Sequence, residues 1–251
     1  MIDQALPWRV EDACLKAWPA LREERIPGWV LRFSEGLTRR ANSANPLHGG
    51  IGDPDAVISA CEACYHAAGL PTFVRVPSFI DPAMEERLEG RGYGAEGKSA
   101  VMHADLGRVP SQSDAAAELA AAPSAEWLGA MSLLQGHSKK KSATYAKIVT
   151  SITIPAAFVG VRDDGRLAAL AYGAMHDGLL CVESVITNVA ARGRGYARRM
   201  LSALIDWAST AGAEGVCLQV EADNDPAISL YRSLELRELY RYHYRRELMP
   251  D

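Results

Sequence analysis

The stretch that decides the fold is residues 185–201, which read VITNVAARGRGYARRML. It continues an apolar, β-branched run that starts at Leu179, and such a run is typical of a buried strand. Beyond Gly193 and Gly195, apolar residues recur at three- and four-residue spacing over positions 197–208, which predicts an amphipathic helix. The sequence therefore predicts a strand, a glycine turn and a helix in immediate succession.

The turn of this unit has the features of a phosphate-binding site. Gly193 and Gly195 lack a Cβ atom, so the backbone N–H groups at the start of the helix lie bare, and such groups bind phosphate. Positive charge surrounds the same turn, from Arg192, Arg194, Arg198 and Arg199. A Rossmann dinucleotide turn is not indicated, because Arg198 stands where its third glycine belongs. The remaining alternative is an ordinary glycine turn with solvated arginines.

Two blocks of the sequence carry a family resemblance. Residues 192–197, Arg-Gly-Arg-Gly-Tyr-Ala, fit the R/Q-x-x-G-x-G/A signature of the GNAT N-acetyltransferase superfamily. Residues 218–236 resemble that family's second block, in which a strand is followed by Asn224, a short helix ending in Leu230-Tyr231, and a turn. Both blocks occur in the order and at the separation that the family has. The resemblance implies acetyl-CoA as the acyl donor and a primary amine of a small molecule or a peptide as the acceptor.

The coenzyme site that the resemblance implies also has a physical rationale. The diphosphate of acetyl-CoA would bind the amides of residues 193–198, at the positive end of the helix dipole. The extended pantetheine arm would pair like an added strand, and a backbone N–H near Ile186 or Thr187 would polarise the thioester carbonyl. Asn224 would contact the coenzyme, cap the following helix, or do both. The predicted coenzyme-binding residues are Val185, Ile186, Thr187, Arg192, Gly193, Arg194, Gly195, Tyr196, Ala197, Arg198 and Asn224.

Aminolysis of a thioester requires a neutral amine and a proton for the departing thiolate. A free alkyl amine has a pKa near ~10.4, so a base must help to remove its proton. The resemblance implies Tyr231 as the acid, whereas the alternative is a packing residue at a helix end. Glu183 is the best candidate base, because a charge in an apolar strand needs a reason and alternation places it on the face of Val185 and Thr187. The alternatives for Glu183 are a surface position or a bulge that reverses its face.

Of two neighbouring positions, Gln219 is not indicated as the base and Glu221 is a weaker candidate than Glu183. Some GNAT enzymes that modify protein N-termini carry a glutamate on the strand before the Asn224 position, but this chain has Gln219 there, which does not accept a proton usefully. Glu221 follows on the same strand, and a chain of water molecules is a further alternative. The predicted catalytic residues are therefore Tyr231 and Glu183.

The composition is that of an ordinary globular protein. The chain has 251 residues, of which 48% are apolar and 23% charged, with a net charge of −4. This balance predicts no nucleic-acid partner, and no segment approaches the roughly 18 apolar residues of a membrane span. Residues 1–10 lack an export signal and the cysteines are odd in number, so a reduced cytoplasmic setting is expected. Cys61, Cys64 and His66 have no second ligand pair, so no metal site is predicted.

The predicted elements occur in a similar order in the two halves of the chain. The first half is expected to contain helix 11–24, a hairpin of strands 28–33 and 37–42, helix 54–68, strand 72–76, a helix from residue 81 and strand 99–106. The second half is expected to contain helices 125–135 and 139–150, strands 157–162, 167–176 and 179–187, helix 195–211, strand 216–221, helix 226–233 and a final strand.

This repeat predicts an α/β (α+β) fold of two GNAT-like mixed, mostly antiparallel sheets flanked by helices. The first domain would comprise residues 1–107, a degenerate GNAT-like unit without the coenzyme turn. The second would comprise residues 124–251 with the acetyl-CoA site, and residues 108–123 would form the seam. One mixed domain with an extension is the alternative.

Together these features predict an acetyl-CoA-dependent N-acetyltransferase in which the amine attacks the thioester directly. One alternative is a non-catalytic acyl-CoA-binding regulatory module, and another is an interaction protein that uses the fold as a scaffold. The acceptor remains open among aminoglycosides, polyamines, amino acids and proteins, because family members share the donor site and vary the acceptor walls. The oligomeric state is also open, with a homodimer among the options.

Overall fold

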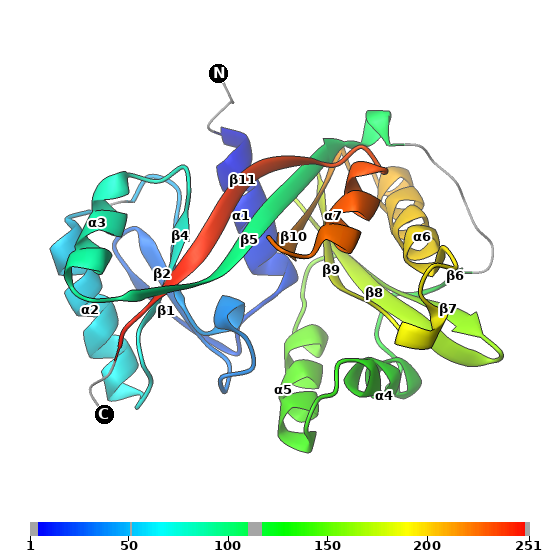
Figure 1. The fold of residues 1–251 in the computed structure, drawn as a ribbon, viewed down its shortest axis with the longest axis horizontal. Helices are drawn as coiled ribbons and strands as arrows, with labels where there is room; N and C mark the ends of the chain where they lie inside the picture. The colour runs from blue at the N-terminus through cyan, green and yellow to red at the C-terminus, as the bar shows by residue number, and fades with distance from the viewer. Residues whose placement is uncertain (1–4, 51, 110–116, 249–251) are drawn as a thin grey trace.

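The structure is a computed structural model, which describes residues 5–50, 52–109 and 117–248. Its strands form one mixed sheet in the order β1-β2-β3-β4-β11-β5-β10-β9-β8-β7-β6, with helices on both faces (Figure 1). Most neighbouring strands run antiparallel, whereas the pairs β3–β4 and β9–β10 are parallel. The mixed, mostly antiparallel fold flanked by helices is confirmed, but the two separate sheets of the sequence prediction are one continuous sheet.

The merger of the two expected sheets has a specific cause in strand pairing. The C-terminal strand β11 (Arg237–Arg246) lies between β4 (Phe73–Pro77) and β5 (Gly94–Asp105), so residues from the far end of the chain complete the first half. The second half of β5, from Ser99 to Asp105, in turn pairs with the whole of β10 (Gly215–Glu221). Figure 1 shows β11 running across the centre of the molecule between the two lobes. Backbone hydrogen bonds therefore connect the two halves at the strand pairs β4–β11, β11–β5 and β5–β10.

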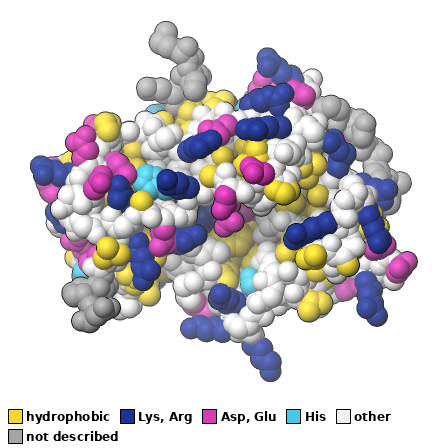
Figure 2. All heavy atoms as spheres, in the orientation of Figure 1, with side chains coloured by type: hydrophobic (Ala, Val, Ile, Leu, Met, Phe, Trp, Pro, Cys, Tyr) yellow, Lys and Arg dark blue, Asp and Glu magenta, His cyan; other side chains and the backbone are white. Residues whose placement is uncertain are grey.

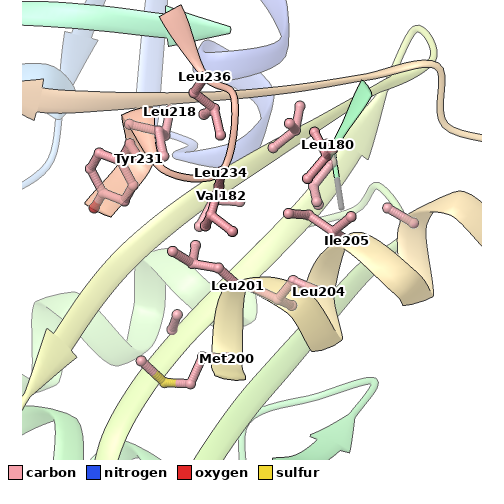
Figure 3. Close-up of a cluster of buried hydrophobic side chains, with 14 of the residues drawn as sticks. Leu180, Val182, Met200, Leu201, Leu204, Ile205, Leu218, Tyr231, Leu234 and Leu236 are labelled. Atoms are coloured by element: carbon pink, nitrogen blue, oxygen red, sulfur yellow. The ribbon is translucent and has the colours of Figure 1, made fainter. Parts of the chain in front are cut away.

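One face of the second half is covered by helix α6 (Tyr196–Thr210), as its apolar periodicity predicts. Its buried side chains Leu201, Leu204 and Ile205 pack against Leu180 and other residues of β8 (Arg166–His176), β9 (Leu179–Thr187) and β10 (Figure 3). Strands β7 (Ala156–Asp163) and β6 (Ala117–Ala120) extend the sheet beyond β8. Strand β6 lies inside the expected seam 108–123, because residues 117–120 pair with β7; residues 110–116 lie outside the described residues.

The opposite face carries three helices. Helix α1 (Ala5–Ala17) packs on β8 and β9, where Tyr172 Oη donates a hydrogen bond to the Ala17 carbonyl oxygen at 2.9 Å. Helices α4 (Ala125–Leu134) and α5 (Lys139–Thr150) continue this layer, each with a serine N-cap at its first turn. Within the described ranges, no helix is long and apolar enough to cross a membrane.

The first half contains β1 (Arg22–Ile26), β2 (Trp29–Phe33), β3 (Ala44–Pro46), α2 (Pro54–Ala67) and α3 (Pro82–Gly90). The predicted helix 11–24 is wrong in its bounds: α1 ends at Ala17, before Pro19, and Arg22–Ile26 is a strand. The predicted hairpin is also wrong, because the turn that joins paired strands is at Gly28, with φ +76°.

The expected strand 37–42 is replaced by a compact loop. The side chain of Asn42 accepts hydrogen bonds from the backbone amides of Ser34 at 2.7 Å and Gly36 at 3.1 Å, which closes the loop on itself. Residues Arg39–Ala41 form a turn of 3-10 helix inside it. This loop brings two arginines of the first half towards the centre of the sheet.

The central strands separate at the point where the chemistry is expected. Strands β9 and β10 pair from Leu179–Gly215 to Val182–Leu218, and beyond that point the ladder stops. Residues 183–187 of β9 then pair only with β8 within the described chain, so the other edge of β9 is open. The short helix α7 (Asp225–Arg232) follows β10 on the side of this gap where the turn before α6 lies. The fold therefore provides an unpaired strand edge beside a helix N-terminus.

Candidate active site

A cavity of about 610 Å³ lies at the open edge of β9, within the size range of small-molecule sites. Its walls come from three segments: the end of β9, the turn before α6, and helix α7. Most of the residues predicted to bind the coenzyme line this one cavity, together with Tyr231: Val185, Ile186, Thr187, Arg192, Gly193, Gly195, Tyr196, Ala197, Arg198 and Asn224. The two sequence blocks that are separated in the chain therefore converge on one site.

The glycine turn has the geometry that the sequence requires. Gly193 has φ +78° and Gly195 has φ +79°, both in the left-handed region where a Cβ atom is unfavourable. Gly195 is the N-cap of α6 and offers no side chain to its amides. After Arg192, the next amide of this turn with a recorded acceptor in the described structure is that of Arg199, which donates to the Gly195 carbonyl oxygen at 3.1 Å. The intervening amides are available for an anion.

The arginines around the turn have different surroundings. The guanidinium of Arg194 makes a salt bridge with Asp163 at 2.7 Å, and its side chain does not line the cavity. Only the backbone of Arg194 is therefore positioned to contribute at the turn, because its side chain is directed to Asp163. Arg198 lines the cavity and donates to Ser233 Oγ at 2.5 Å. Arg192 also lines it, so two cationic side chains face the space next to the amides.

A β-bulge shapes the open edge of β9. Leu170 of β8 pairs with Ile186 and Tyr172 pairs with Glu183, so two residues, 184 and 185, oppose one. Ser184 in the bulge has φ +56°. The bulge reverses the side-chain alternation, so Val185 packs on the α6 side whereas Glu183 follows Cys181 towards α1. The prediction that Glu183 shares a face with Val185 is wrong for this reason.

Tyr231 lies on α7 at the edge of the apolar cluster beneath the cavity. Its ring is 5% exposed, and its hydroxyl points away from Leu218 and Leu234 (Figure 3). Burial raises the pKa of Tyr231 to about 12, and the charge of Glu183 adds to the rise. The phenol therefore keeps its proton near neutral pH. Asn224 caps α7 by accepting from the Ala227 amide at 3.3 Å, and it also lines the cavity.

Glu183 is 3% exposed and makes a salt bridge with Arg40. The distance from Glu183 Oε1 to Arg40 Nη1 is 2.6 Å. Burial raises the pKa of the Glu183 carboxyl, and the neighbouring Arg40 charge opposes this rise. A surface position for Glu183 is excluded. The carboxylate is thus a desolvated acceptor held in place by one cation from the other half of the chain.

Gln219 and the weaker base candidate Glu221 both lie on β10. The Gln219 carboxamide oxygen accepts hydrogen bonds from Tyr242 Oη at 2.8 Å and Arg75 Nη1 at 3.3 Å, so its role here is structural. Glu221 is exposed at the end of the strand and lines a second, smaller cavity together with Arg40.

The structure adds residues that the sequence gave no reason to select. Arg40 is one, because nothing in its local pattern links it to Glu183, 143 positions away. A cluster of buried thiols is another: the Sγ atoms of Cys14, Cys181 and Cys217 all lie within 4.8 Å of one another. Hydrogen bonds with the other thiols and burial raise the pKa of Cys181 well above its usual value. The thiol of Cys181 therefore remains uncharged beside Glu183.

This combination of sheet, gap and amide turn is the fold of the GNAT-type N-acetyltransferases. Residues 8–245 match a family model described as "Probable histone acetyltransferase Rv0428c C-terminal". The match spans most of the chain, and the protein belongs to this family.

Individual relatives agree with this placement. The chain is 25% identical over 241 residues to the uncharacterized N-acetyltransferase YobR of Bacillus subtilis strain 168, covering 94% of this chain and 97% of the relative. The solved GCN5-related N-acetyltransferase from Kribbella flavida superposes with a TM-score of 0.72 at 17% identity, covering 99% of this chain and 96% of that one. A tandem GNAT protein from the clavulanic acid biosynthesis pathway gives a TM-score of 0.64 at 14% identity, covering 83% and 76%. These structural likenesses support the fold.

Proposed function

We propose that the protein transfers an acetyl group from acetyl-CoA to the primary amine of a small molecule or peptide, by direct attack of the amine on the thioester. The observation that carries the proposal is the convergence of three features on one cavity. These are a turn with available amides, an unpaired strand edge, and the phenol of Tyr231 with its raised pKa. Each feature matches one part of the coenzyme: diphosphate, pantetheine amides and thioester sulfur.

Binding of the coenzyme follows from the geometry of the turn and the strand. The diphosphate binds the amides of residues 193–198, assisted by the charges of Arg192 and Arg198. The pantetheine arm pairs with the open edge of β9. Because the Asn188 amide donates to Ala168 of β8, strand alternation directs the Thr187 N–H to the open edge, where it stabilises the oxyanion.

The reaction then needs two proton transfers. The neutral amine forms a bond to the thioester carbonyl carbon, and one nitrogen proton passes to Glu183, directly or through water. The C–S bond breaks as the tetrahedral intermediate collapses, and the departing thiolate takes the proton of Tyr231. Glu183 releases its proton and Tyr231 regains one through solvent, which restores the site.

The proposal includes a tandem arrangement, with residues 1–107 as a GNAT-like half that lacks the coenzyme turn. In support, Asp81-Pro82-Ala83 at the start of α3 repeats Asp225-Pro226-Ala227 at the start of α7. Each helix also has a proline in its first turn and a side-chain N-cap directly before it, which is Asp81 in α3 and Asn224 in α7. A cavity of about 430 Å³ adjoins α3, without arginine-rich glycine turns in its lining.

The test is a thiol-release assay with acetyl-CoA and a panel of chemically diverse amines, combined with calorimetry of acetyl-CoA binding. We expect binding and amine-dependent release of free CoA. Binding without release from any amine would instead support a regulatory acyl-CoA-binding module. The absence of acetyl-CoA binding would contradict the proposal altogether and favour a scaffold role.

A further inference from the structure

A second cavity of about 260 Å³ lies over the end of β10, from Gln219 to Glu221. The coenzyme cavity is lined instead by the end of β9, which is no longer paired with β10 at this point. The remaining walls of the second cavity come from β5, from β11 with Tyr242 and Tyr244, and from the 34–43 loop of the first half. We call it the acceptor cavity.

Arg40 connects the acceptor cavity to the proposed base. Its side chain lines the cavity, and its guanidinium holds Glu183 at 2.6 Å. The Arg40 guanidinium also lies over the Trp18 ring at 4.9 Å, which fixes its position. A molecule in the acceptor cavity would therefore lie next to Arg40, whose guanidinium binds Glu183.

The lining of this cavity contains arginine N–H groups that have no acceptor among the described residues. A guanidinium carries five N–H groups, yet within the described residues one such group of Arg40 and one of Arg39 make a recorded bond. The partner of Arg39 is Glu96, at 2.7 Å on the exposed rim. Tyr244 is 2% exposed and lines the cavity; its hydroxyl lies near Arg75 but makes no hydrogen bond of good geometry with the described residues. Such a buried donor is costly unless a ligand or water completes it.

Two acidic groups are associated with the same cavity. Exposed Glu221 lines it, whereas Glu183 lies outside the lining and is connected with it through its ion pair with Arg40. A ligand with one cationic and one anionic group would place the amine towards Glu183 and the anion among Arg39, Arg40 and Tyr244. A planar carboxylate suits an arginine, because a guanidinium donates two parallel hydrogen bonds to it.

We propose that the acceptor cavity binds the amine substrate, and that this substrate is a small amine that carries a carboxylate, such as an amino acid. The inference rests on the proposed acetyl transfer and names its substrate class. It also gives the first half of the chain a function, since Arg39 and Arg40 lie outside the coenzyme-binding half. Arg39 and Tyr244 act as specificity residues for the carboxylate.

The test uses binding, so it does not depend on turnover. The CoA-saturated protein is titrated by calorimetry with the twenty standard amino acids and β-alanine, each compared with its carboxamide. We expect at least one acid to bind about tenfold or more tightly than its amide, because charge-assisted hydrogen bonds are lost in the amide. If no acid exceeds its amide, or if phosphoethanolamine or a lysine peptide binds more tightly than every acid, the proposal is wrong.

Two variants localise the effect. Arg39→Gln and Tyr244→Phe should each abolish most of the acid-over-amide preference while leaving amide affinity within about twofold. Arg22→Gln, an exposed arginine paired with Glu24, is the matched control and should change neither. Arg39→Lys should restore part of the preference, since it keeps the charge but loses the fork. A preference that survives both Arg39→Gln and Tyr244→Phe would place the carboxylate elsewhere and overturn the assignment.

Failure of this inference and failure of the proposed function give different results. Carboxylate-selective binding without CoA release would retain the site but refute acetyl transfer. Release with amines that lack a carboxylate, at rates equal to those of their acid counterparts, would retain acetyl transfer but refute the substrate class.

Discussion

At the scale of single residues, Glu183 and Arg40 determine how a proton would leave the amine in the reaction that we propose. The carboxyl is buried, which raises its pKa, and it stays next to a cation that favours the charged form. A base with a raised pKa is protonated at acidic pH and becomes competent as the pH rises above the ordinary carboxyl range. Activity should therefore increase with pH through a limb that belongs to Glu183.

Replacement of Glu183 by glutamine should remove that limb and lower kcat by roughly 10²–10⁴-fold, the usual contribution of a positioned base. The amide retains a hydrogen-bond acceptor for Arg40, so folding should be preserved. The measurement is the pH profile of kcat/KM between about pH 5 and 9. Glu221→Gln, on the exposed end of β10, is the control; an unchanged profile in Glu183→Gln would assign the base to solvent.

Tyr231→Phe should lower kcat by a factor in the same 10²–10⁴ range while leaving the dissociation constant of acetyl-CoA within about twofold. The reason is that the phenol supplies a proton to the thiolate but no large part of the binding energy. Tyr196→Phe removes a hydroxyl from the same cavity and serves as the control. Equal turnover in Tyr231→Phe and the wild type would mean that the thiolate leaves unassisted.

Because the pKa of Tyr231 is raised to about 12, we expect its ionisation to have no effect on the pH profile of activity at moderately alkaline pH. A group with that pKa keeps its proton until well above pH 10, so deprotonation of Tyr231 should cause no loss of activity between pH 7 and 10. Rate measurements with a saturating amine would check this. A decline with an apparent pKa near 9 that disappears in Tyr231→Phe would contradict the assignment.

At the scale of elements, the strand–turn–helix unit has left-handed glycines at the turn that lines the cavity. Gly195 has φ +79°, and an added Cβ would meet no protein atom within 4 Å, because it would project into open space at the turn. Gly212, just beyond the other end of α6, has φ +87° and equally open surroundings, but it does not line the cavity. The two glycines carry similar strain at different distances from the site.

Gly195→Ala and Gly212→Ala should therefore lose similar stability, on the order of 1–2 kcal/mol, from a left-handed non-glycine residue. Only Gly195→Ala should also weaken acetyl-CoA binding, by about tenfold or more, because its methyl group occupies the space of the diphosphate. Thermal denaturation and calorimetry of both variants separate the two effects. Equal coenzyme affinity in the two variants would show that the diphosphate does not bind at this turn.

At the scale of the whole molecule, a buried ion pair of the first half lies in contact with strand β11 of the second half. Arg75 of β4 and Glu11 of α1 lie 2.6 Å apart, and both side chains are 3% exposed. Glu11 also accepts a hydrogen bond from Tyr240 of β11, and the Arg75 guanidinium lies over the Tyr242 ring at 3.4 Å. Elements from both ends of the chain therefore meet at this pair.

Arg75→Met should lower the free energy of unfolding by about 3–5 kcal/mol, because it leaves the Glu11 carboxylate buried without its cation. The double variant Glu11→Leu/Arg75→Met should recover much of that loss, since neither charge then remains to be desolvated. Urea unfolding followed by circular dichroism gives the comparison, and it should show one transition. Two separated transitions would indicate halves that unfold independently, despite the shared sheet.

The sequence alone determined the local chemistry. The glycine pair, the amphipathic helix and the Asn224–Tyr231 block were predicted to lie around one site, and these segments do line one cavity. They could be found in the sequence because they depend on nearest neighbours and on helical or strand periodicity. Local signals of the same kind predicted most elements of the second half. They were less reliable in residues 11–42, where Pro19 and the Asn42 side chain outweighed the apolar pattern.

The tertiary structure alone decided which distant residues meet. Strand pairing placed β11 between β4 and β5 and merged the expected sheets, and the bulge at Ser184 turned Glu183 towards Arg40. No local pattern predicts either event. The hydrogen bonds that pair strands are made by backbone groups that nearly all residues share, and a one-residue bulge moves the following side chains to the opposite face of the sheet. The glycine turn could therefore be predicted from the sequence, whereas the cavity that we propose for the acceptor forms only when the two halves fold together.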